Sequence, residues 1–390
     1  MESSAQEEAV GAVRALLPAA RIEPVEWLRR TDRSAVLRVR AEGAGWPGPQ
    51  ALIVKLFPDA GEAWARESAA LIAAPASAPV PDLIAAGADP PLVVMTDAGS
   101  GSSLADVLLA RDATAAGTAV EEFATALARL HLSTSGQETR RAFAAELATR
   151  SGGTAAESVM PGYADRAVRD LAALCDQLEV PVPDGALAGL AEIPDRLGPD
   201  GPAALTLADA CPDNSVRQGA GYVLIDFEEA QWRHIAWDAA YLTVPWPACW
   251  CAYALPAEVA RRGVARYRAA LADELPYAAT SAFEHDLALA TIAWDLISAS
   301  WFLAAALIKE ARFQNGTGSS VDAPTGRAVI MHHLGDASRS SVSPPLAELA
   351  RRLHGELVRR WGEVPLALAP AWDQAKPRES DEQATAKFSR

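Results

Sequence analysis

The sequence predicts an α+β fold with a small, strand-rich N-terminal lobe and a larger, mostly helical C-terminal lobe. Short apolar or alternating segments that favour strands lie within residues 21–98, whereas helix-forming segments dominate from residue 102 onward. The chain has 390 residues, 50% of them hydrophobic, which suits two units of about 100–200 residues. We expect an N-terminal lobe at 1–98, a C-terminal lobe at 99–370 and a disordered, polar tail at 371–390.

The N-terminal lobe is expected to begin with a helix over residues 1–20 and to continue as strands through 21–57. A Gly/Pro-rich loop, Glu42–Gln50, separates two of these strands. The Ala-rich segment 58–75 favours a helix, and 80–98 returns to strand. This order places one helix between the strands of a small sheet.

A lysine interrupts the apolar strand of residues 51–57. An unpaired Lys55 would be costly inside a sheet, so we expect a partner in Glu67, on the helix that follows. The alternative is a lysine at a sheet edge whose ammonium group lies in solvent.

The C-terminal lobe is expected to be helical over residues 102–200, with looser segments at Ser151–Thr154 and Pro181–Gly185. Ser102 and Asp106 supply capping signals for its first helix. His131, near the end of a long helical segment, fits a structural role better than a catalytic one.

Two polar motifs follow in close succession. Asp209 and Asn214 are separated by four residues, and Asp226 directly follows the apolar strand Tyr222–Ile225. The turn-forming segment Gln218–Gly221 predicts a hairpin that brings the three polar side chains to one end. Taken alone, an Asp and an Asn at this spacing commonly cap turns and helices.

These motifs, in this order, are similar to the catalytic loop and metal-binding motif of protein kinases. The chain resembles the aminoglycoside phosphotransferase family over roughly residues 20–360, most strongly at 52–67 and 205–242. The resemblance implies a bilobal protein-kinase-like fold. It also implies Mg²⁺-dependent transfer of a phosphoryl group from ATP to a hydroxyl of a small molecule, with GTP left open as the nucleotide.

The resemblance assigns roles to the polar residues. Asp209 would accept the proton of the acceptor hydroxyl, while Asn214 and Asp226 would hold Mg²⁺. Glu228 would be a second metal ligand or a cap. The Lys55–Glu67 pair would hold the α- and β-phosphates.

Further positions are implied for the nucleotide. Ser34, in the expected phosphate-covering loop, would contact the phosphates, and backbone groups at about Thr96 and Asp97 would meet adenine. The chain departs from the expected pattern in three places. Glu228 stands where protein kinases have glycine, although members of the small-molecule family often carry an acidic residue there. Leu207 replaces the usual histidine, and the loop at 31–34 contains no glycine. The last two departures keep open a nucleotide-binding pseudokinase that serves as an interaction module.

The region after the second motif is expected to determine the acceptor. Asp238 fits a structural residue that braces the catalytic loop better than a substrate ligand. Trp294 and Trp301 lie seven residues apart on one helix face, where they would wall an acceptor pocket or pack in the core. The candidate acceptor contacts are Glu229, Trp246, Asp286, Trp294 and Asp295; for the carboxylates the alternative is a solvated surface.

A formal net charge of −15 argues against nucleic acid and suits a cationic acceptor. We expect an amine-bearing acceptor such as an aminoglycoside, which would make the chain an antibiotic-resistance enzyme. Choline-, homoserine- or sugar-amine-type metabolite kinases are the alternative. The oligomeric state stays open.

The spacing of the four cysteines favours neither a disulfide framework nor a four-cysteine zinc site, and Cys211 fits a small apolar filler. The acidic start of the chain is unlike a signal peptide, and no uncharged stretch reaches about 18 residues. We therefore expect a cytoplasmic protein without membrane contact.

Overall fold

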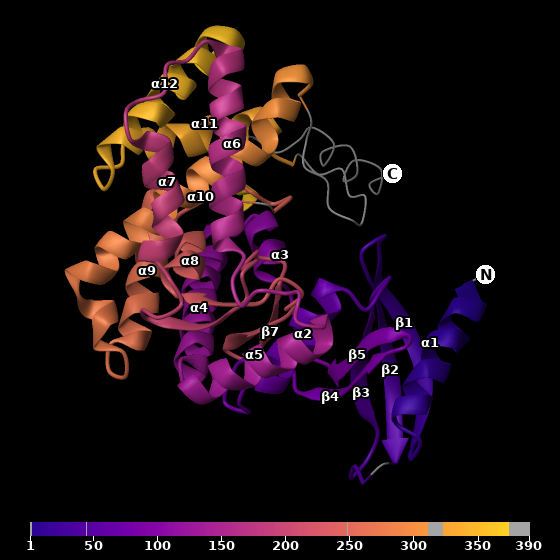
Figure 1. Cartoon of the computed structure of the whole chain (residues 1–390). Coiled ribbons are helices and arrows are strands. Elements are labelled where there is room, and N and C mark those ends of the chain that lie inside the picture. Colours follow the sequence, from indigo (N-terminus) through magenta and orange to yellow (C-terminus); the bar gives the residue numbers. More distant parts are fainter. Residues whose placement is uncertain (1, 44, 248, 311–322, 374–390) are drawn as a thin grey trace, which may run out of the picture.

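The computed structural model describes residues 2–43, 45–247, 249–310 and 323–373, arranged in two lobes (Figure 1). The smaller lobe contains a five-stranded antiparallel sheet in the order β1-β2-β3-β5-β4. Its elements are α1 (Glu2–Leu16), β1 (Ala20–Arg30), β2 (Ala35–Gly43), β3 (Gln50–Leu56), α2 (Glu62–Ala73), β4 (Leu83–Ala88) and β5 (Pro91–Thr96).

The two helices of this lobe, α1 and α2, pack against opposite faces of the sheet. Along β5, Leu92 and Val94 belong to the core cluster of α1, while Val93 and Met95 belong to the cluster of α2. Successive side chains of a strand point to opposite faces, so one apolar strand serves both clusters. The second cluster continues into the larger lobe, which makes α2 the helix that joins the lobes.

The larger lobe is mostly helical, as the sequence indicated. Its helices are α3 (Leu104–Leu109), α4 (Ala113–Thr134), α5 (Gln137–Ser151), α6 (Met160–Leu178), α7 (Ala186–Arg196), α8 (Ala236–Ala239), α9 (Ala257–Leu271), α10 (Ser281–Ile308), α11 (Gly326–Ser338) and α12 (Pro344–Trp361), with short 3₁₀ turns at Ala240–Leu242, Pro276–Ala279 and Pro370–Trp372. Most of the tail expected to be disordered, 374–390, lies outside the described residues.

Four short strands carry the polar motifs. β6 (Ala203–Thr206) pairs with β9 (Gln231–His234), and β7 (Ser215–Gln218) pairs with β8 (Gly221–Leu224). The β7–β8 pair is the hairpin that the sequence predicted. Asp209 and Asn214 lie between β6 and β7, and Asp226 follows β8.

Helix α10 is the one described helix long and apolar enough to cross a membrane by length and composition. It packs against α6, α8 and α11, and 61% of its most apolar window is buried inside the protein. Its apolar character is therefore explained by its place in the core of the larger lobe.

A buried ion pair lies beneath the loop that joins β6 to β7. Asp238 forms an ion pair with Arg233 and accepts a hydrogen bond from the backbone N–H of Leu207 at 3.1 Å. His131 Nε2 is 3.5 Å from the same carboxylate. Burial alone would raise the pKa of Asp238, but Arg233 and His131 outweigh it and lower the pKa to about 2. The bracing role expected for Asp238 matches these contacts.

Replacement of Asp238 should strongly destabilise the larger lobe. Asp238→Asn leaves the guanidinium of Arg233 buried without its counter-ion, which should cost about 3–5 kcal/mol in urea unfolding. Glu192→Gln, in the exposed pair with Arg196, should leave the unfolding midpoint nearly unchanged.

The pH dependence tests the same assignment. Because the folded-state pKa of Asp238 is depressed, its contribution is present above the ordinary carboxyl pKa of about 4 and is lost as the pH falls toward 2. The difference in stability between the wild type and Asp238→Asn should shrink over that window. A difference that stays constant from pH 6 to about pH 2.5 would contradict the assignment.

Candidate active site

Asp209 lies at the end of a strained turn after β6. The preceding residue, Ala208, has φ of 66°, a conformation that non-glycine residues seldom adopt. Its carbonyl accepts hydrogen bonds from Arg233 Nη2 at 3.2 Å and Tyr241 Oη at 3.1 Å, which hold the turn. Buried side chains from outside the loop therefore hold the backbone that precedes Asp209, and Asn214 of the same loop donates to the Asp209 carboxylate at 3.4 Å.

The environment of Asp209 favours a basic carboxylate. Its Oδ1 atom is buried and accepts no hydrogen bond from the described residues. Burial raises the pKa of the Asp209 carboxyl well above its usual range, and neighbouring Cys249 and Asp213 raise it further. Such a group binds a proton more readily than an exposed aspartate.

Asn214 links the two polar motifs. The side-chain Nδ2 of Asn214 donates to the backbone carbonyl of Asp209 at 2.9 Å, and the backbone carbonyl of Asn214 accepts the N–H of Ile225 at 3.1 Å. Asp226, which follows Ile225, has φ of 68°. The structure thus brings together the three residues that the sequence expected at one end of the hairpin.

Lys55 lies at the centre of a carboxylate cluster between the lobes. Its Nζ is 2.5 Å from Glu67 Oε2, 2.5 Å from Asp226 Oδ1 and 2.9 Å from Glu228 Oε2. The contact predicted between Lys55 and Glu67 is present, and the solvent-exposed alternative is wrong because Lys55 is only 5% exposed.

The same cluster has the composition of a divalent-cation site. Oxygen atoms of Glu67, Asp226 and Glu228 all lie within 4.8 Å of one another. One ammonium group faces three carboxylates, so the fully ionised cluster has a formal charge of −2. Burial raises the pKa of Glu67 to about 7 although Lys55 opposes it. Oxygen ligands and excess negative charge fit Mg²⁺.

A cavity of about 280 Å³ lies between the sheet and the hairpin, above this cluster. Apolar side chains from both lobes line it, among them Val36, Ile53, Val216 and Ile225, and Lys55 lies at one end. An apolar slot next to a lysine has the character of a nucleotide cavity, and we use that name for it.

The predicted nucleotide contacts all line the nucleotide cavity, with one restriction. Ser34, Thr96 and Asp97 are in its wall. However, the backbone N–H groups of Thr96 and Asp97 already donate to Asp82 and Ala51, and the Asp97 carboxylate pairs with Arg38. An adenine contact at these two positions would therefore use other atoms.

The glycine-free loop is closed by Thr31. Its Oγ1 accepts from the backbone N–H groups of Arg33 and Ser34, both at 3.2 Å, and its own N–H donates to the Ser34 carbonyl at 2.9 Å. A side chain that forms the turn removes the need for glycine at this site.

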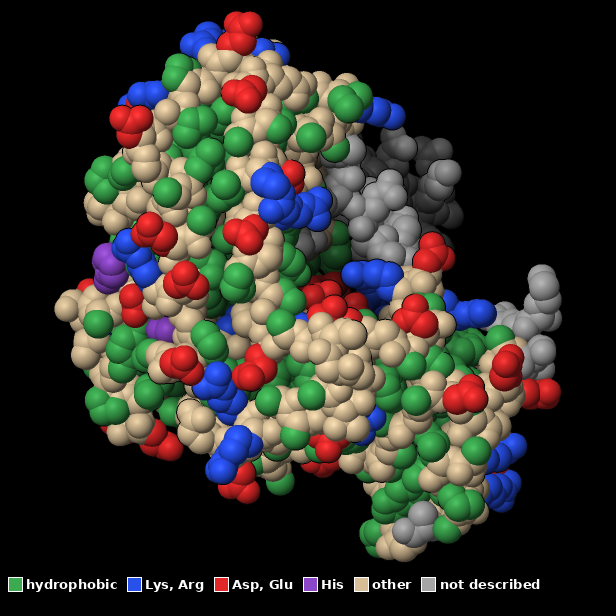
Figure 2. Space-filling view, in the orientation of Figure 1, with side chains coloured by type: hydrophobic (Ala, Val, Ile, Leu, Met, Phe, Trp, Pro, Cys, Tyr) green, Lys and Arg blue, Asp and Glu red, His purple; other side chains and the backbone are tan. Residues whose placement is uncertain are grey.

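A second cavity of about 750 Å³, here called the acceptor cavity, adjoins the first. Both cavities share Arg29, Asp213, Asn214 and Asp226, while Asp209 lies only in the wall of the second. In Figure 2, Asp and Glu side chains gather in the hollow where the two lobes meet. The remaining wall is rich in aromatic side chains: Tyr163, Tyr241, Trp250, Trp294, Trp301 and Phe302.

Two of the five candidate acceptor contacts line the acceptor cavity. Glu229 is in its wall, and Trp294 is there beside Trp301 with ring centroids 6.0 Å apart. Trp294 is nevertheless almost fully buried and donates its indole N–H to Trp237, so it is also a core residue.

The other three candidates are directed elsewhere, which corrects the sequence-based expectation. Asp295 is buried and forms a 2.8 Å hydrogen bond with His333, and Asp286 accepts from the Tyr277 hydroxyl. Trp246 is buried and lines a separate cavity. Helical spacing alone does not distinguish the cavity face of α10 from its core face.

Sequence reasoning missed several residues of the acceptor wall. Cys249 and Trp250 reach the cavity from the loop after α8, and Trp250 Nε1 donates to Asp213 Oδ2 at 2.9 Å. Arg29 enters from the end of β1, and Arg33 enters from the loop between β1 and β2. Arg29 precedes the glycine-free loop and Arg33 lies within it, so both were usable signals in the sequence. Nothing in the sequence places Trp250 against Asp213.

Comparison with known proteins agrees with this architecture. Residues 26–280 match the model of the phosphotransferase enzyme family. No curated protein matches the chain. Similar solved structures include an ethanolamine kinase from Plasmodium vivax, with 12% identity over 86% of this chain and 84% of that one and a TM-score of 0.49.

Two further solved structures are similar to this chain. A choline/ethanolamine kinase family protein from Mesorhizobium loti is 14% identical over 90% of this chain and 99% of that one, with a TM-score of 0.47. The aminoglycoside phosphotransferase APH(4)-Ia is 12% identical over 90% and 99%, with a TM-score of 0.44. The match to the family model extends from β1 through both polar motifs. The chain belongs to the phosphotransferase enzyme family and has its bilobal, kinase-like fold.

Proposed function

We propose that this protein transfers a phosphoryl group from ATP to a hydroxyl of a cationic small molecule, with Mg²⁺ as cofactor. The observation that carries the proposal is the meeting of the two cavities at Asn214 and Asp226, with Asp209 on the acceptor side and Lys55 on the nucleotide side. A phosphoryl group that moves between two substrates needs this arrangement.

The residues divide the work by position. Asp209 lies on the acceptor side, where it would orient the attacking hydroxyl and accept its proton. Lys55, held by Glu67, would bind the phosphates. Asn214, Asp226 and Glu228 would hold Mg²⁺, which neutralises charge on the phosphate oxygens.

The end of β1 and the loop that follows it would contribute positive charge to the phosphate site. Arg33 Nη1 is 3.8 Å from Glu228, and Arg29 lies in the wall of both cavities. We assign these arginines, with Ser34, to the phosphate contacts that a glycine-rich loop makes through its backbone. These contacts support an active phosphotransferase over the pseudokinase alternative.

The acceptor cavity supports an amine-bearing acceptor. Its carboxylates would pair with ammonium groups, and its tryptophan and tyrosine rings would contact cations through their faces. A volume of about 750 Å³ suits a drug-sized molecule better than a small amino alcohol. We therefore favour an aminoglycoside-like natural product, hence a resistance or self-protection role in the cytoplasm, over a choline-type metabolite.

The acceptor class is tested by acceptor-stimulated ADP release with a panel of aminoglycosides, choline, ethanolamine and homoserine. The aminoglycosides should stimulate most. Glu229→Gln should raise the KM of the stimulating acceptor about tenfold through loss of a charge-assisted contact and leave the KM of ATP unchanged. Stimulation by choline or ethanolamine alone would favour the metabolite kinase. ADP release that no acceptor increases would contradict the proposed class.

The division between base and metal ligand predicts two distinct losses. Asp209→Ala should lower turnover about 10²–10⁴-fold with nucleotide affinity nearly intact, because only proton acceptance is removed. Asp226→Ala should also abolish Mg²⁺-dependent nucleotide binding, measured by calorimetry. Asp170→Ala, an exposed carboxylate of α6, serves as the control. A fully active Asp209→Ala enzyme would refute the base assignment.

The Lys55–Glu67 contact predicts a coupled effect on the use of ATP. Lys55→Ala should lower kcat/KM for ATP about 10²–10³-fold and Glu67→Ala less, because Glu67 acts by holding the lysine. The double variant should lose much less than the product of the two losses. Glu8→Gln, at an exposed position of α1, should have little effect. Full additivity would mean that the two residues act independently.

A further inference from the structure

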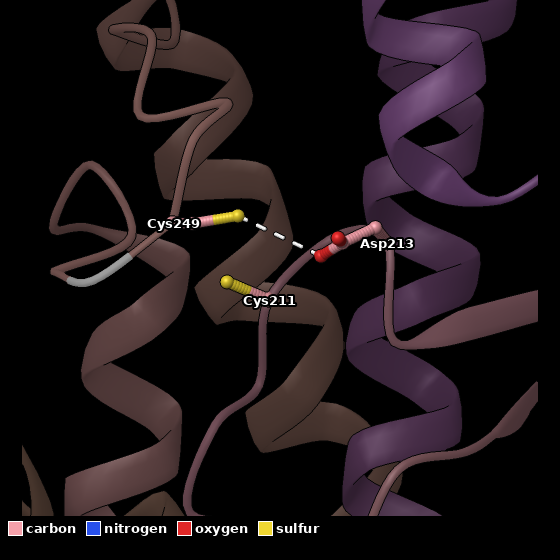
Figure 3. Close-up of side chains that lie close together, drawn as sticks. All are labelled: Cys211, Asp213 and Cys249. Atoms are coloured by element: carbon pink, nitrogen blue, oxygen red, sulfur yellow. Dashed lines mark hydrogen bonds between the residues drawn. The ribbon is translucent and has the colours of Figure 1, made fainter. Parts of the chain in front are cut away.

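Three of the four cysteines lie close together at the loop between β6 and β7, although Cys211 is far from the other two in the sequence. Cys211 lies within that loop, and Cys249 and Cys251 come from the loop after α8. Cys249 Sγ is 3.6 Å from Asp213 Oδ1 and 3.1 Å from Cys251 Sγ. Figure 3 shows the thiols of Cys211 and Cys249 directed toward the same space as the Asp213 carboxylate.

We propose that Cys211, Cys249 and Asp213 form a binding site for a thiophilic d¹⁰ cation, for which Zn²⁺ is the best fit. Their ligand atoms all lie within 4.8 Å of one another. The site is distinct from the carboxylate cluster at Lys55, and it goes beyond phosphoryl transfer without depending on it.

The donor set and its spacing select zinc over magnesium. Thiolates bind Zn²⁺ at about 2.3 Å and carboxylates at about 2.0–2.2 Å, so a tetrahedral site separates sulfur from oxygen by about 3.6 Å. The distance between Cys249 Sγ and Asp213 Oδ1 is 3.6 Å. Magnesium prefers an octahedral shell of oxygen ligands, which two thiols do not provide.

The residues around the cluster orient its ligands. Trp250 Nε1 holds Asp213 Oδ2 at 2.9 Å, which leaves Oδ1 facing Cys249. A hydrogen bond to the non-ligating atom is the usual support of a metal ligand. Two zinc-bound sulfurs would be about 3.8 Å apart, so Cys251, at 3.1 Å from Cys249, fits a thiol that donates to the Cys249 sulfur.

Charge and access favour a cation at this position. Among the described residues, no lysine, arginine or histidine lies within ion-pairing distance of Asp213. All three ligand residues line the acceptor cavity, so water can reach the cluster as a fourth ligand. Apolar filling accounts for Cys175, buried with Leu171 and Leu174 on α6, but it does not account for a carboxylate between two thiols.

The test uses the full chain, reduced with a phosphine and freed of metal by a chelator. Zn²⁺ is titrated in competition with a chromophoric chelator, and Co²⁺ serves as a spectroscopic probe. We expect one equivalent of zinc to bind in the presence of excess Mg²⁺, and bound cobalt to show a sulfur-to-metal charge-transfer band. Cys211→Ser and Cys249→Ser should each weaken zinc binding at least about 100-fold and remove the band. Cys175→Ser, the matched control, should change neither.

Three results would each contradict the proposed zinc site. The first is that cobalt binds without the sulfur-to-metal charge-transfer band, and the second is that both serine variants keep the zinc affinity of the wild type. The third is that Asp226→Ala loses zinc binding while the serine variants keep it. If a serine variant does not fold, alkylation of the wild type in mild denaturant replaces it. Zinc should then slow labelling of Cys211 and Cys249 but not of Cys175, and equal labelling of all three would refute the site. None of these readouts measures phosphoryl transfer, so the outcome is separate from that of the proposed function.

Discussion

The arrangement of the two lobes depends on the ion pairs that the ammonium group of Lys55 forms with carboxylates from both lobes. This group brings together a strand of the small sheet, the helix α2 and the segment after β8 through Glu67, Asp226 and Glu228. A buried lysine is stable only when such partners are present, and the carboxylates need the lysine for the same reason. Both cavities end at this cluster.

Arg66 reinforces the same junction from the other side of α2. Its guanidinium, 2% exposed, donates to the backbone carbonyls of Ala230 and Ala156 at 2.8 Å, and both acceptors lie in the larger lobe. One helix thus contributes a carboxylate to the charged cluster and an arginine to the interface. Movement of α2 would change both contacts together, which couples the shape of the nucleotide cavity to the position of the lobes.

Two of the departures from the expected pattern have local physical explanations. Leu207 is fully buried, and its backbone N–H donates to the Asp238 carboxylate. This hydrogen bond holds the loop between β6 and β7 without a histidine at position 207. Thr31 closes the turn between β1 and β2 with its hydroxyl, in place of glycine. At Leu207 a backbone N–H makes the stabilising contact, and at Thr31 a side-chain hydroxyl makes it.

The sequence by itself determined the fold class, the hairpin and the grouping of Lys55, Glu67, Asp209, Asn214 and Asp226, because these depend on local periodicity and on short, ordered motifs. Tertiary structure alone decided the acceptor wall. Asp295 and Asp286 have the right charge and helix, yet packing turns them toward His333 and Tyr277. Cys211 and Cys249 meet only because the chain after α8 returns to the loop between β6 and β7. Contacts between segments that are distant in the chain depend on how helices pack, and that information is spread over the whole core.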